Sequence, residues 1–342
     1  MGLAAFIRTI PKVELHVHLE GSIEPATLLE LARRNRVELP ATSEAELREW
    51  YVFRDFPHFV EVYIAISRCI CTTEDLELIG RAFLAGQAAQ QIIYSEVTFT
   101  AQTHQRHYGL PFREQIAALN RARRWAEAEL GVSMGLIIDI ARDVAPEAGL
   151  EVADWVIDAY GDGVVALGLG GSEAGHPPEK HAAAFARARA AGVPLVLHAG
   201  ETAGAASIRG ALAQGSVRLG HGVRCLEDPQ LVAELRERQV PLEVCPTSNV
   251  CLGVVPSFAE HPLPELLAHG LYVTLNSDDP PMFNTTLTDE YLRAAATFGF
   301  DRAIVEQLVC NAARAALLPA DRRTALIQRI QAAIDAAPID RE

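Results

Sequence analysis

The chain has 342 residues, of which 49% are hydrophobic and 22% charged, a composition typical of a soluble globular enzyme with one large α/β domain or two smaller ones. Its formal net charge of −14 argues against DNA or RNA as a partner. No apolar run approaches the ~20 residues that cross a bilayer, and the amino-terminal residues become polar too early for a secretory signal. We therefore expect a cytoplasmic protein that binds neither nucleic acid nor membrane.

Short aliphatic runs recur along the chain, and each is followed by a turn and then by an amphipathic helical pattern. They predict eight strands, at residues 12–19, 92–100, 132–140, 164–171, 194–201, 217–222, 240–248 and 271–279. Alternating strands and helices indicate a parallel sheet covered by helices. Eight units predict a (β/α)8 TIM barrel, which typically needs ~250 residues. A doubly wound two-domain fold is the alternative, disfavoured because no G-x-G-x-x-G follows the first strand.

The residues beyond the eight units fall in two places. Residues 22–91 are too long for one crossover and predict a helical insertion after the first strand. Residues 288–342 predict helices that complete the barrel at the end of the chain. We expect a single α/β barrel domain over residues 1–342 that includes the insertion.

The first strand carries an unusual polar face. In "VELHVHLEGS", residues 13–22, aliphatic side chains alternate with Glu14, His16, His18 and Glu20, which is the period of a β-strand. Two histidines on one strand face can aim at one cation. A solvated strand with two incidental histidines is the alternative, and this segment alone does not decide between them.

Other polar residues follow the ends of later strands, where a barrel carries its active site. They are Gly170 and Gly171, His198 and Glu201, His221, and Asp278 and Asp279. The pattern fits one divalent metal held by three imidazoles and one carboxylate, from His16, His18, His198 and Asp278. That ligand set suits Zn²⁺ and leaves room for a water molecule. Glu201 and His221 remain available as acid and base.

Five segments together resemble the adenosine deaminase family of the amidohydrolase superfamily. They are "PKVELHVHLEGS", "HAGET", "GHG", "CPTSN" and "NSDDPPMF", in the expected order over nearly the whole chain. The resemblance implies a barrel with one zinc ion per chain that hydrolyses the exocyclic amine of a 6-aminopurine and releases ammonia. The fourth strand, "VVALGLGG", has no lysine to bridge two metals, and no P-C-x-x-C motif of polynucleotide deaminases occurs.

The resemblance also implies a role for each site residue. His16, His18, His198 and Asp278 would bind zinc. Glu201 would protonate purine N1, and His221 would orient and help to deprotonate the attacking water. Asp279 would contact the N7 side of the purine, and the Gly171 backbone N–H the N3 side. All these positions are filled, which favours an enzyme over a barrel that binds nucleosides without turnover.

The substrate is indicated by two departures from adenosine deaminases. This chain has "HLEG" with Glu20 where they resemble "HLDG", and "LGGSE" where they resemble "LAGDE". Both departures resemble two side branches, the free-adenine deaminases and the aminodeoxyfutalosine deaminases of menaquinone synthesis. Adenine deaminases tend toward "DSSE" after the fourth strand, whereas Gly170 and Gly171 would leave the N9 edge bare, with room for a sugar. Glu20 is a further candidate for substrate contact. Aminodeoxyfutalosine, a purine nucleoside with a carboxylated aryl ketone, is the first choice of small-molecule substrate, before adenosine and adenine.

The helical insertion contains candidates for the distal part of this substrate. Phe53, Phe56 and Phe59 predict an aromatic helix face, which could line a pocket or belong to a core. Arg54 and Arg68 are candidate carboxylate ligands, although surface arginines are common. His104 and His107 are expected in a loop after the second strand. No role is assigned to the remaining histidines, which are His58, His176, His181, His261 and His269.

Overall fold

The computed structural model describes residues 1–338 and contains one sheet of eight parallel strands in the order β1 to β8. The strands are β1 (Lys12–His18), β2 (Ile92–Phe99), β3 (Ser133–Ala141), β4 (Val164–Gly170), β5 (Leu195–Ala199), β6 (Arg218–His221), β7 (Leu242–Val244) and β8 (Val273–Leu275). Each lies within or beside the run that predicted it. The sequence-based prediction of a TIM barrel is therefore confirmed.

The barrel closes between β8 and β1 through a few specific contacts. His18 N–H donates to the Asp278 carbonyl at 2.9 Å, and Asp278 N–H donates to the His16 carbonyl at 3.1 Å. Two residues before Asp278, the Asn276 side-chain oxygen accepts from the backbone N–H groups of Leu15 and His16. The amide of Asn276 thus replaces a strand carbonyl. This closure brings Asp278 beside the two histidines of β1.

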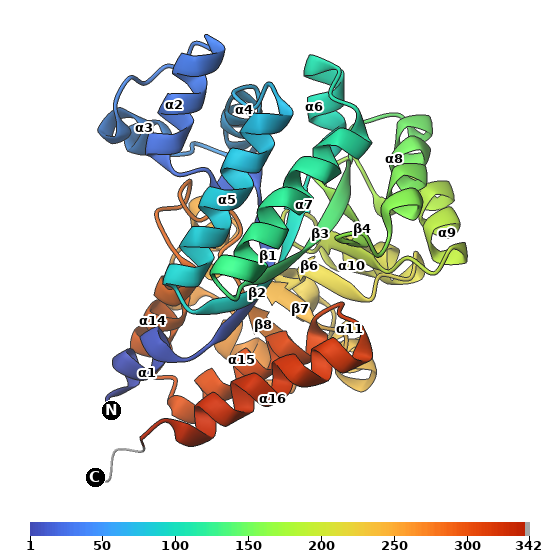
Figure 1. Ribbon diagram of the computed structural model, residues 1–342. Coiled ribbons are helices and arrows are strands. Elements are labelled where there is room, and N and C mark those ends of the chain that lie inside the picture. The colour runs from blue at the N-terminus through green and yellow to red at the C-terminus, as the bar shows by residue number, and fades with distance from the viewer. Residues whose placement is uncertain (339–342) are drawn as a thin grey trace.

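Helices surround the strands, and the strand side chains are buried on both faces of the sheet (Figure 1). The helices are α1 (Leu3–Thr9), α2 (Pro25–Asn35), α3 (Glu44–Trp50), α4 (Phe56–Ser67), α5 (Thr73–Ala89), α6 (Ala101–Tyr108), α7 (Phe112–Glu129), α8 (Pro146–Ala159), α9 (Ala182–Ala190), α10 (Ala205–Ala213), α11 (Pro229–Arg238), α12 (Pro246–Cys251), α13 (Leu263–Ala268), α14 (Leu287–Phe298), α15 (Arg302–Ala315) and α16 (Ala320–Ala336). Short 3-10 turns connect several of them.

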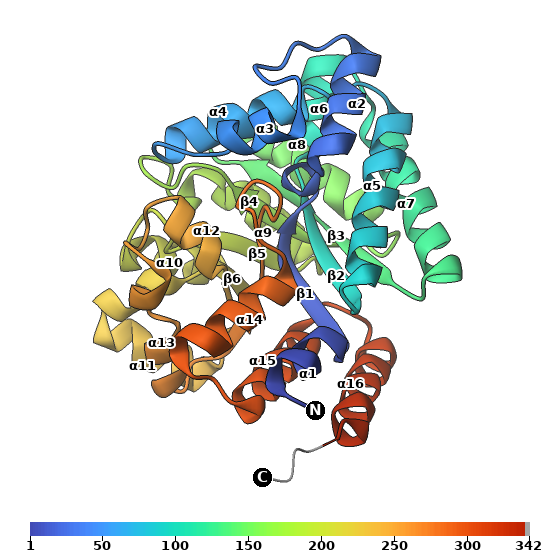
Figure 2. The same ribbon diagram turned by 90° about the vertical axis from the view of Figure 1, so that its left-hand side faces the viewer.

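The predicted insertion at 22–91 divides into two parts. Helix α5 packs against β2 and α7, so it is the barrel's own helix between the first two strands (Figure 1). Helices α2, α3 and α4 form the additional part, and they lie over the carboxyl ends of the strands (Figure 2). Helices α1, α15 and α16 lie at the opposite end. The extra helices are therefore placed to wall the active-site end of the barrel.

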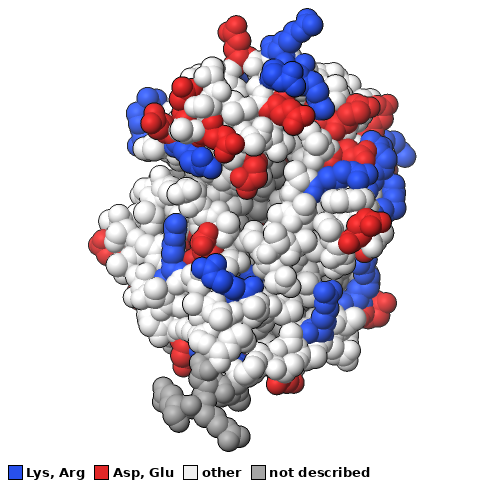
Figure 3. All heavy atoms as spheres, turned by 60° about the vertical axis from the view of Figure 1, so that its left-hand side comes forward, with Lys and Arg blue, Asp and Glu red and all other residues white. Residues whose placement is uncertain are grey.

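The surface offers two further observations. No helix within residues 1–338 is both long enough and apolar enough to cross a bilayer. On the face drawn in Figure 3, acidic and basic side chains are intermixed, and the basic ones form no continuous stripe. That face therefore lacks the basic surface typical of proteins that bind nucleic acid.

Candidate active site

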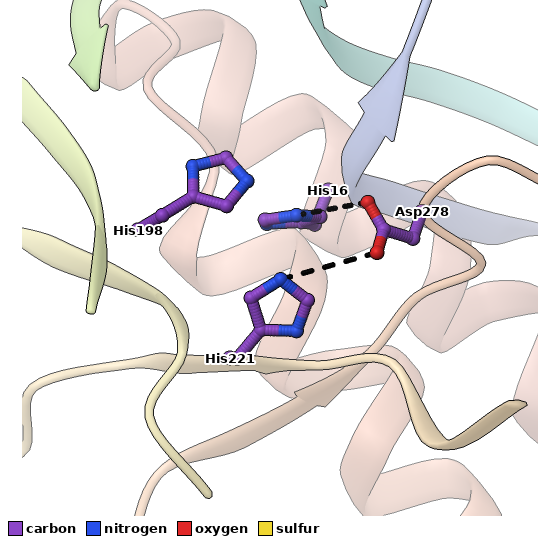
Figure 4. Close-up of side chains that lie close together, drawn as sticks. All are labelled: His16, His198, His221 and Asp278. Carbon is purple, nitrogen blue, oxygen red and sulfur yellow. Dashed lines mark ion pairs between the residues drawn. The ribbon is translucent and has the colours of Figure 1, made fainter. Parts of the chain in front are cut away.

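Three histidines, His16, His198 and His221, converge with Asp278 at the carboxyl end of the barrel (Figure 4). His18 also lies beside the Asp278 carboxylate group, with Oδ1 of Asp278 3.3 Å from its Nε2. His16 and His18 end β1, while His198 on β5 and His221 on β6 are brought together by a register that pairs Ala199 with His221. Ring centroids of His16 lie 4.5 Å from His198 and 4.7 Å from His221. Gly220 permits this approach, because a Cβ there would lie 2.9 Å from Cε1 of His16.

The donor atoms of this cluster fit a metal ion. Nε2 of His16 is buried with no hydrogen-bond partner. Nε2 of His18 lies 3.2 Å from Nε2 of His198, and Oδ1 of Asp278 lies 3.3 Å from Nε2 of both His16 and His18. Two imidazole lone pairs at that separation repel unless a proton or a cation lies between them. Three of the four expected ligands, His16, His198 and Asp278, have donor atoms close enough to share one ion, and His221 completes that group. His18, the fourth expected ligand, lies in a second group with Asp278 and Asp279.

Neighbouring groups orient the rings for coordination. The Leu169 carbonyl accepts from Nδ1–H of His198 at 2.9 Å, which leaves its Nε2 unprotonated in the neutral ring. The Glu243 carboxylate lies 2.9 Å from Nδ1 of His16 and does the same for that ring. Such partners fix the tautomer and increase the basicity of metal-binding histidines.

Glu243 belongs to a buried chain of charges inside the barrel. Its second oxygen accepts from Nε of Arg218 at 2.6 Å, and Nη2 of Arg218 lies 2.5 Å from Glu96. All three residues are no more than 1% exposed. The two carboxylates outweigh the effect of burial and raise the pKa of Arg218 above its usual range. The sequence analysis missed all three residues, although acids and an arginine within apolar strands were a visible signal.

The electrostatics of the cluster favour positive charge at its centre. Burial alone would lower the pKa of His16, but hydrogen bonds to Asp278 and Glu243 raise it to about 10. Burial would raise the pKa of Asp278, yet contacts with His16 and His18 hold it well below its usual range. Burial and the charge of Asp278 instead raise the pKa of Glu201 well above its usual range. Asp278 is thus an anionic ligand candidate, and Glu201 a neutral acid.

Glu201 is held by a turn that depends on Glu173. The Glu173 carboxylate is buried and accepts four backbone N–H groups and one hydroxyl, from Gly200, Glu201, Thr202, Ala203 and Ser207. These bonds outweigh burial and lower the pKa of Glu173. Glu173 was quoted in "LGGSE" but assigned no role. Its signal was an acid placed two residues after a pair of glycines at the end of a strand.

A cavity of about 520 Å³ opens from the metal cluster toward the inserted helices. Its lining includes residues to which the sequence analysis assigned catalytic or substrate-binding roles, which are Gly170, Gly171, Glu201, His221 and Asp279. The outer wall contains Phe56, Phe59 and Tyr63 of α4, whose rings pack with centroids 5.8–6.0 Å apart. Of the predicted aromatic face, Phe56 and Phe59 therefore line the cavity, whereas Phe53 precedes α4 and packs against Phe59 and Phe283. The volume falls within the range of small-molecule sites.

A family profile described as adenosine deaminase matches residues 11–333. The chain belongs to the adenosine deaminase family. An aminodeoxyfutalosine deaminase from Streptomyces coelicolor is 39% identical over 331 residues, which cover 96% of this chain and 85% of that protein. An adenine deaminase from Geotalea uraniireducens is 41% identical over 290 residues, which cover 84% and 80%. An amidohydrolase from Burkholderia ambifaria, solved with bound zinc, has a TM-score of 0.89 at 28% identity, over 98% of this chain and 94% of that one.

Family membership together with the site makes this chain a purine deaminase, a hydrolase that acts on adenine-like substrates. Relatives that act on aminodeoxyfutalosine and on adenine match it about equally well. The overall similarity therefore does not separate these two substrates, and individual cavity residues have to be considered.

Asp139, at the end of β3, is a cavity residue that the sequence analysis of this deaminase missed. It is 4% exposed, and its Oδ1 has no hydrogen-bond partner. Burial raises its pKa to about 6. A Cβ at Gly170 would lie only 2.5 Å from Oδ2 of Asp139, so the carboxylate occupies the space that the glycine leaves. The edge that we expected to be bare therefore carries an acid.

Glu20 lies outside this cavity wall. It is fully buried, and Oε1 accepts from the Thr100 N–H and lies 3.1 Å from Nε2 of His104, while Oε2 accepts from the Tyr63 hydroxyl. It thus ties the end of β1 to α4 and α6. Its expected contact with substrate remains a prediction. His104 and His107 lie on helix α6 rather than in the loop that the sequence suggested.

Proposed function

We propose that this chain is a cytoplasmic, zinc-dependent deaminase whose substrate is aminodeoxyfutalosine, with one zinc ion per chain. Zinc would be held by His16, His18, His198 and Asp278. The observation that carries the substrate assignment is a pair of unpaired arginines at the cavity mouth. Both are exposed and line the same cavity as His18, His198 and Asp278, and we assign the carboxylate of this substrate to them.

The chemistry divides among groups whose positions are known. A divalent metal bound here would supply a water acidified toward hydroxide at neutral pH. Glu201, whose pKa is raised by burial, carries the proton that purine N1 needs as C6 becomes tetrahedral. Asp279, with a buried and unpartnered Oδ1, would hold the N7 side of the ring. Asp279 and Gly171 both line the cavity, which supports their assignment to the same bound purine.

The exposed part of the cavity lining contains two arginines, one histidine and one acidic residue, Asp143. Arg68 follows α4, and Arg106 and His107 lie on α6; all three are exposed and line the cavity. Neither arginine forms an ion pair or a side-chain hydrogen bond with another residue in the part of the chain that the structure describes. The Tyr108 hydroxyl donates to the Arg68 carbonyl and holds the two helices together here. Guanidinium groups placed this way suit a carboxylate on a long substituent.

Adenine is the second candidate, and Asp139 favours it. Free adenine carries a polar edge at N9 that a nucleoside lacks. The unpartnered oxygen of Asp139 beside Gly170 could accept an N–H from that edge. The same oxygen could also accept a sugar hydroxyl. Asp139 is thus consistent with either substrate, whereas the distal arginines would have no partner in an adenine complex.

The decisive experiment compares aminodeoxyfutalosine, adenosine and adenine as substrates of the zinc-loaded protein. Ammonia release and the ultraviolet change from amino- to oxopurine would be followed together. We expect the highest kcat/KM with aminodeoxyfutalosine. Equal or higher kcat/KM with adenine would make this chain an adenine deaminase.

Variants of the mouth test the role of the cations. We expect Arg68→Met and Arg106→Met each to raise KM for aminodeoxyfutalosine about tenfold, as loss of a partly exposed charged hydrogen bond would do. KM for adenine should not change. Arg54→Met is the matched control, because Arg54 is exposed on the same insertion but is not a cavity-lining residue. An unchanged KM in both mouth variants would remove the support for an anionic substrate.

A further inference from the structure

A line of buried hydrogen bonds runs from the start of helix α13 to His221. The Leu263 backbone N–H donates to Nδ1 of His261 at 3.0 Å. Nε2 of His261 lies 3.1 Å from Oδ1 of Asn249, and Nδ2 of Asn249 lies 3.4 Å from Nδ1 of His221. The three side chains are 3%, 0% and 1% exposed in that order along the line.

The direction of every bond in this line follows from its first member. A backbone N–H can only donate, so Nδ1 of His261 is an acceptor, and the neutral ring carries its proton on Nε2. That proton is donated to Oδ1 of Asn249, which orients the amide. The Asn249 N–H then donates to Nδ1 of His221. An imidazole that accepts at Nδ1 is neutral and carries its proton on Nε2.

Nε2 of His221 faces the catalytic cluster. It lies 3.7 Å from Oε1 of Glu201 and 3.9 Å from Oδ2 of Asp278 (Figure 4). We infer that Asn249 and His261 are positioning residues that lock His221 in the Nε2–H tautomer, so that His221 enters the reaction as a hydrogen-bond donor. The inference rests on the proposed function, because it concerns the same site.

Two consequences follow for His221. A protonated Nε2 cannot bind a metal, which separates this ring from the other three histidines of the cluster. It also cannot accept the first proton of the attacking water. His221 therefore holds the water oxygen by donating to it, and the proton released on addition to C6 passes to a carboxylate, from Asp278 or Glu201. The orienting role expected for His221 is kept, and the deprotonating role moves elsewhere.

His261 was assigned no role in the sequence analysis because it lies in an ordinary loop. Its burial is the feature that the sequence did not reveal. Burial, followed by the influence of His221, lowers the pKa of His261 to about 4, so its ring stays neutral at neutral pH. A neutral His261 is what a directional relay requires.

The tautomer can be measured directly by nuclear magnetic resonance of zinc-loaded protein labelled with ¹⁵N-histidine. Long-range ¹H–¹⁵N spectra distinguish Nε2–H from Nδ1–H rings, and the signals lost in His221→Asn assign His221. We expect the Nε2–H pattern in the unmodified chain. This measurement needs no substrate, so it stays informative even if the chain proves inactive on every purine. An Nδ1–H pattern would overturn the inference.

Variants of the two positioning residues give the second test. Asn249→Asp offers His221 an acceptor in place of a donor, so its ring should change to the Nδ1–H pattern. With zinc content unchanged, we expect kcat to fall about 10–100-fold, as for other residues behind a catalytic ring, and KM to stay constant. His261→Gln keeps an N–H toward Asn249 and should retain more activity than His261→Leu. An Asn249→Asp protein that keeps the Nε2–H pattern, or equal losses in the two His261 variants, would contradict the relay.

Discussion

Glu173→Gln is the change that most directly tests how the turn carrying Glu201 is held. The wild-type carboxylate is 3% exposed and accepts five hydrogen bonds. Three backbone N–H groups donate to Oε2 at 2.7–2.9 Å, while the Gly200 N–H and the Ser207 hydroxyl donate to Oε1. Glutamine has one acceptor oxygen, so it cannot serve both sides.

The expected loss can be worked out bond by bond. With its oxygen at the Oε2 position, glutamine keeps three backbone bonds, each weakened from about 1.5–3 to about 0.5–1.5 kcal/mol because the acceptor is now neutral. Its amide then faces the Gly200 N–H, and a buried donor without a partner costs about 1–3 kcal/mol. Together these effects weaken the turn by about 4–7 kcal/mol. Because other packing contacts also hold the turn, only part of this free energy should be lost from catalysis. We expect kcat to fall about 100-fold, which corresponds to about 2.7 kcal/mol.

Two measurements check this prediction. Steady-state kinetics should show the loss in kcat, and hydrogen exchange should accelerate at the amides of residues 200–203. Glu227→Gln is the control, since Glu227 is 47% exposed and pairs with Arg224 on the surface. Its effect should stay within about twofold, as for an exposed ion pair. A Glu173→Gln enzyme with normal kcat and normal exchange would refute the idea that this carboxylate holds Glu201 in place.

The remaining predictions concern the same site. Glu201→Gln should keep its bound zinc, measured by elemental analysis, and lose about 10²–10⁴ in kcat because the general acid is gone; a normal kcat would show that Glu201 is not the acid. Asp278→Ala should bind zinc more weakly in a competition titration with a chelator, and unchanged affinity would place the fourth ligand elsewhere. Gly170→Ala should impair turnover, since its Cβ would lie 2.5 Å from Oδ2 of Asp139, and Gly170→Ala combined with Asp139→Ala should recover part of it. The pKa of Glu173 is lowered in the folded protein. The stabilisation of the turn by Glu173 should therefore be complete above the ordinary pKa of about 4.3 and be lost as pH falls through the lower folded value. Hydrogen exchange at the amides of residues 200–203 in metal-free protein should follow that dependence, and amides that stay protected at the lowest pH would contradict it.

The fold was predictable because each strand is a short apolar run that ends in a turn, and eight such runs leave few architectures. The site was predictable in part for a related reason. Residues that end parallel strands share one rim, so His198, His221 and Asp278 could be grouped before their neighbours were known. The alternation of residues along a strand predicts which sheet face a side chain lies on, and its position in the strand predicts its level along the barrel axis. These two properties were sufficient to group the candidate metal ligands.

Residues that act through a partner on another strand were not predictable in the same way. Glu243 contacts His16, and Asp139 occupies the space beside Gly170, only because of the register between particular strands. A single sequence does not specify that register. Glu20 shows the same limit, since its position after the histidines suggested a substrate contact, and only the fold shows that Thr100, His104 and Tyr63 contact its two oxygens.

Backbone strain explains why residues at the carboxyl ends of the strands are held by additional hydrogen bonds. Among described residues other than glycine, Arg36 and Gln239 have positive φ at helix ends, where this is common. His221 and Asp278 have φ of 61° and 67° at strand ends, where it is not. Such conformations cost about 1–3 kcal/mol each and persist only where the surroundings determine them.

The surroundings of His221 and Asp278 do determine them. Asp278 is fixed by two backbone bonds to β1 and by the Ser248 hydroxyl, which donates to Oδ2 at 2.6 Å. His221 is fixed by its pairing with Ala199 and by Asn249. The left-handed backbone lies at the last residue of β6 in His221, and three residues beyond the end of β8 in Asp278. The fold itself therefore fixes the positions of the His221 ring and the Asp278 carboxylate relative to each other. The hydrogen bonds that hold each residue offset the strain of its backbone conformation.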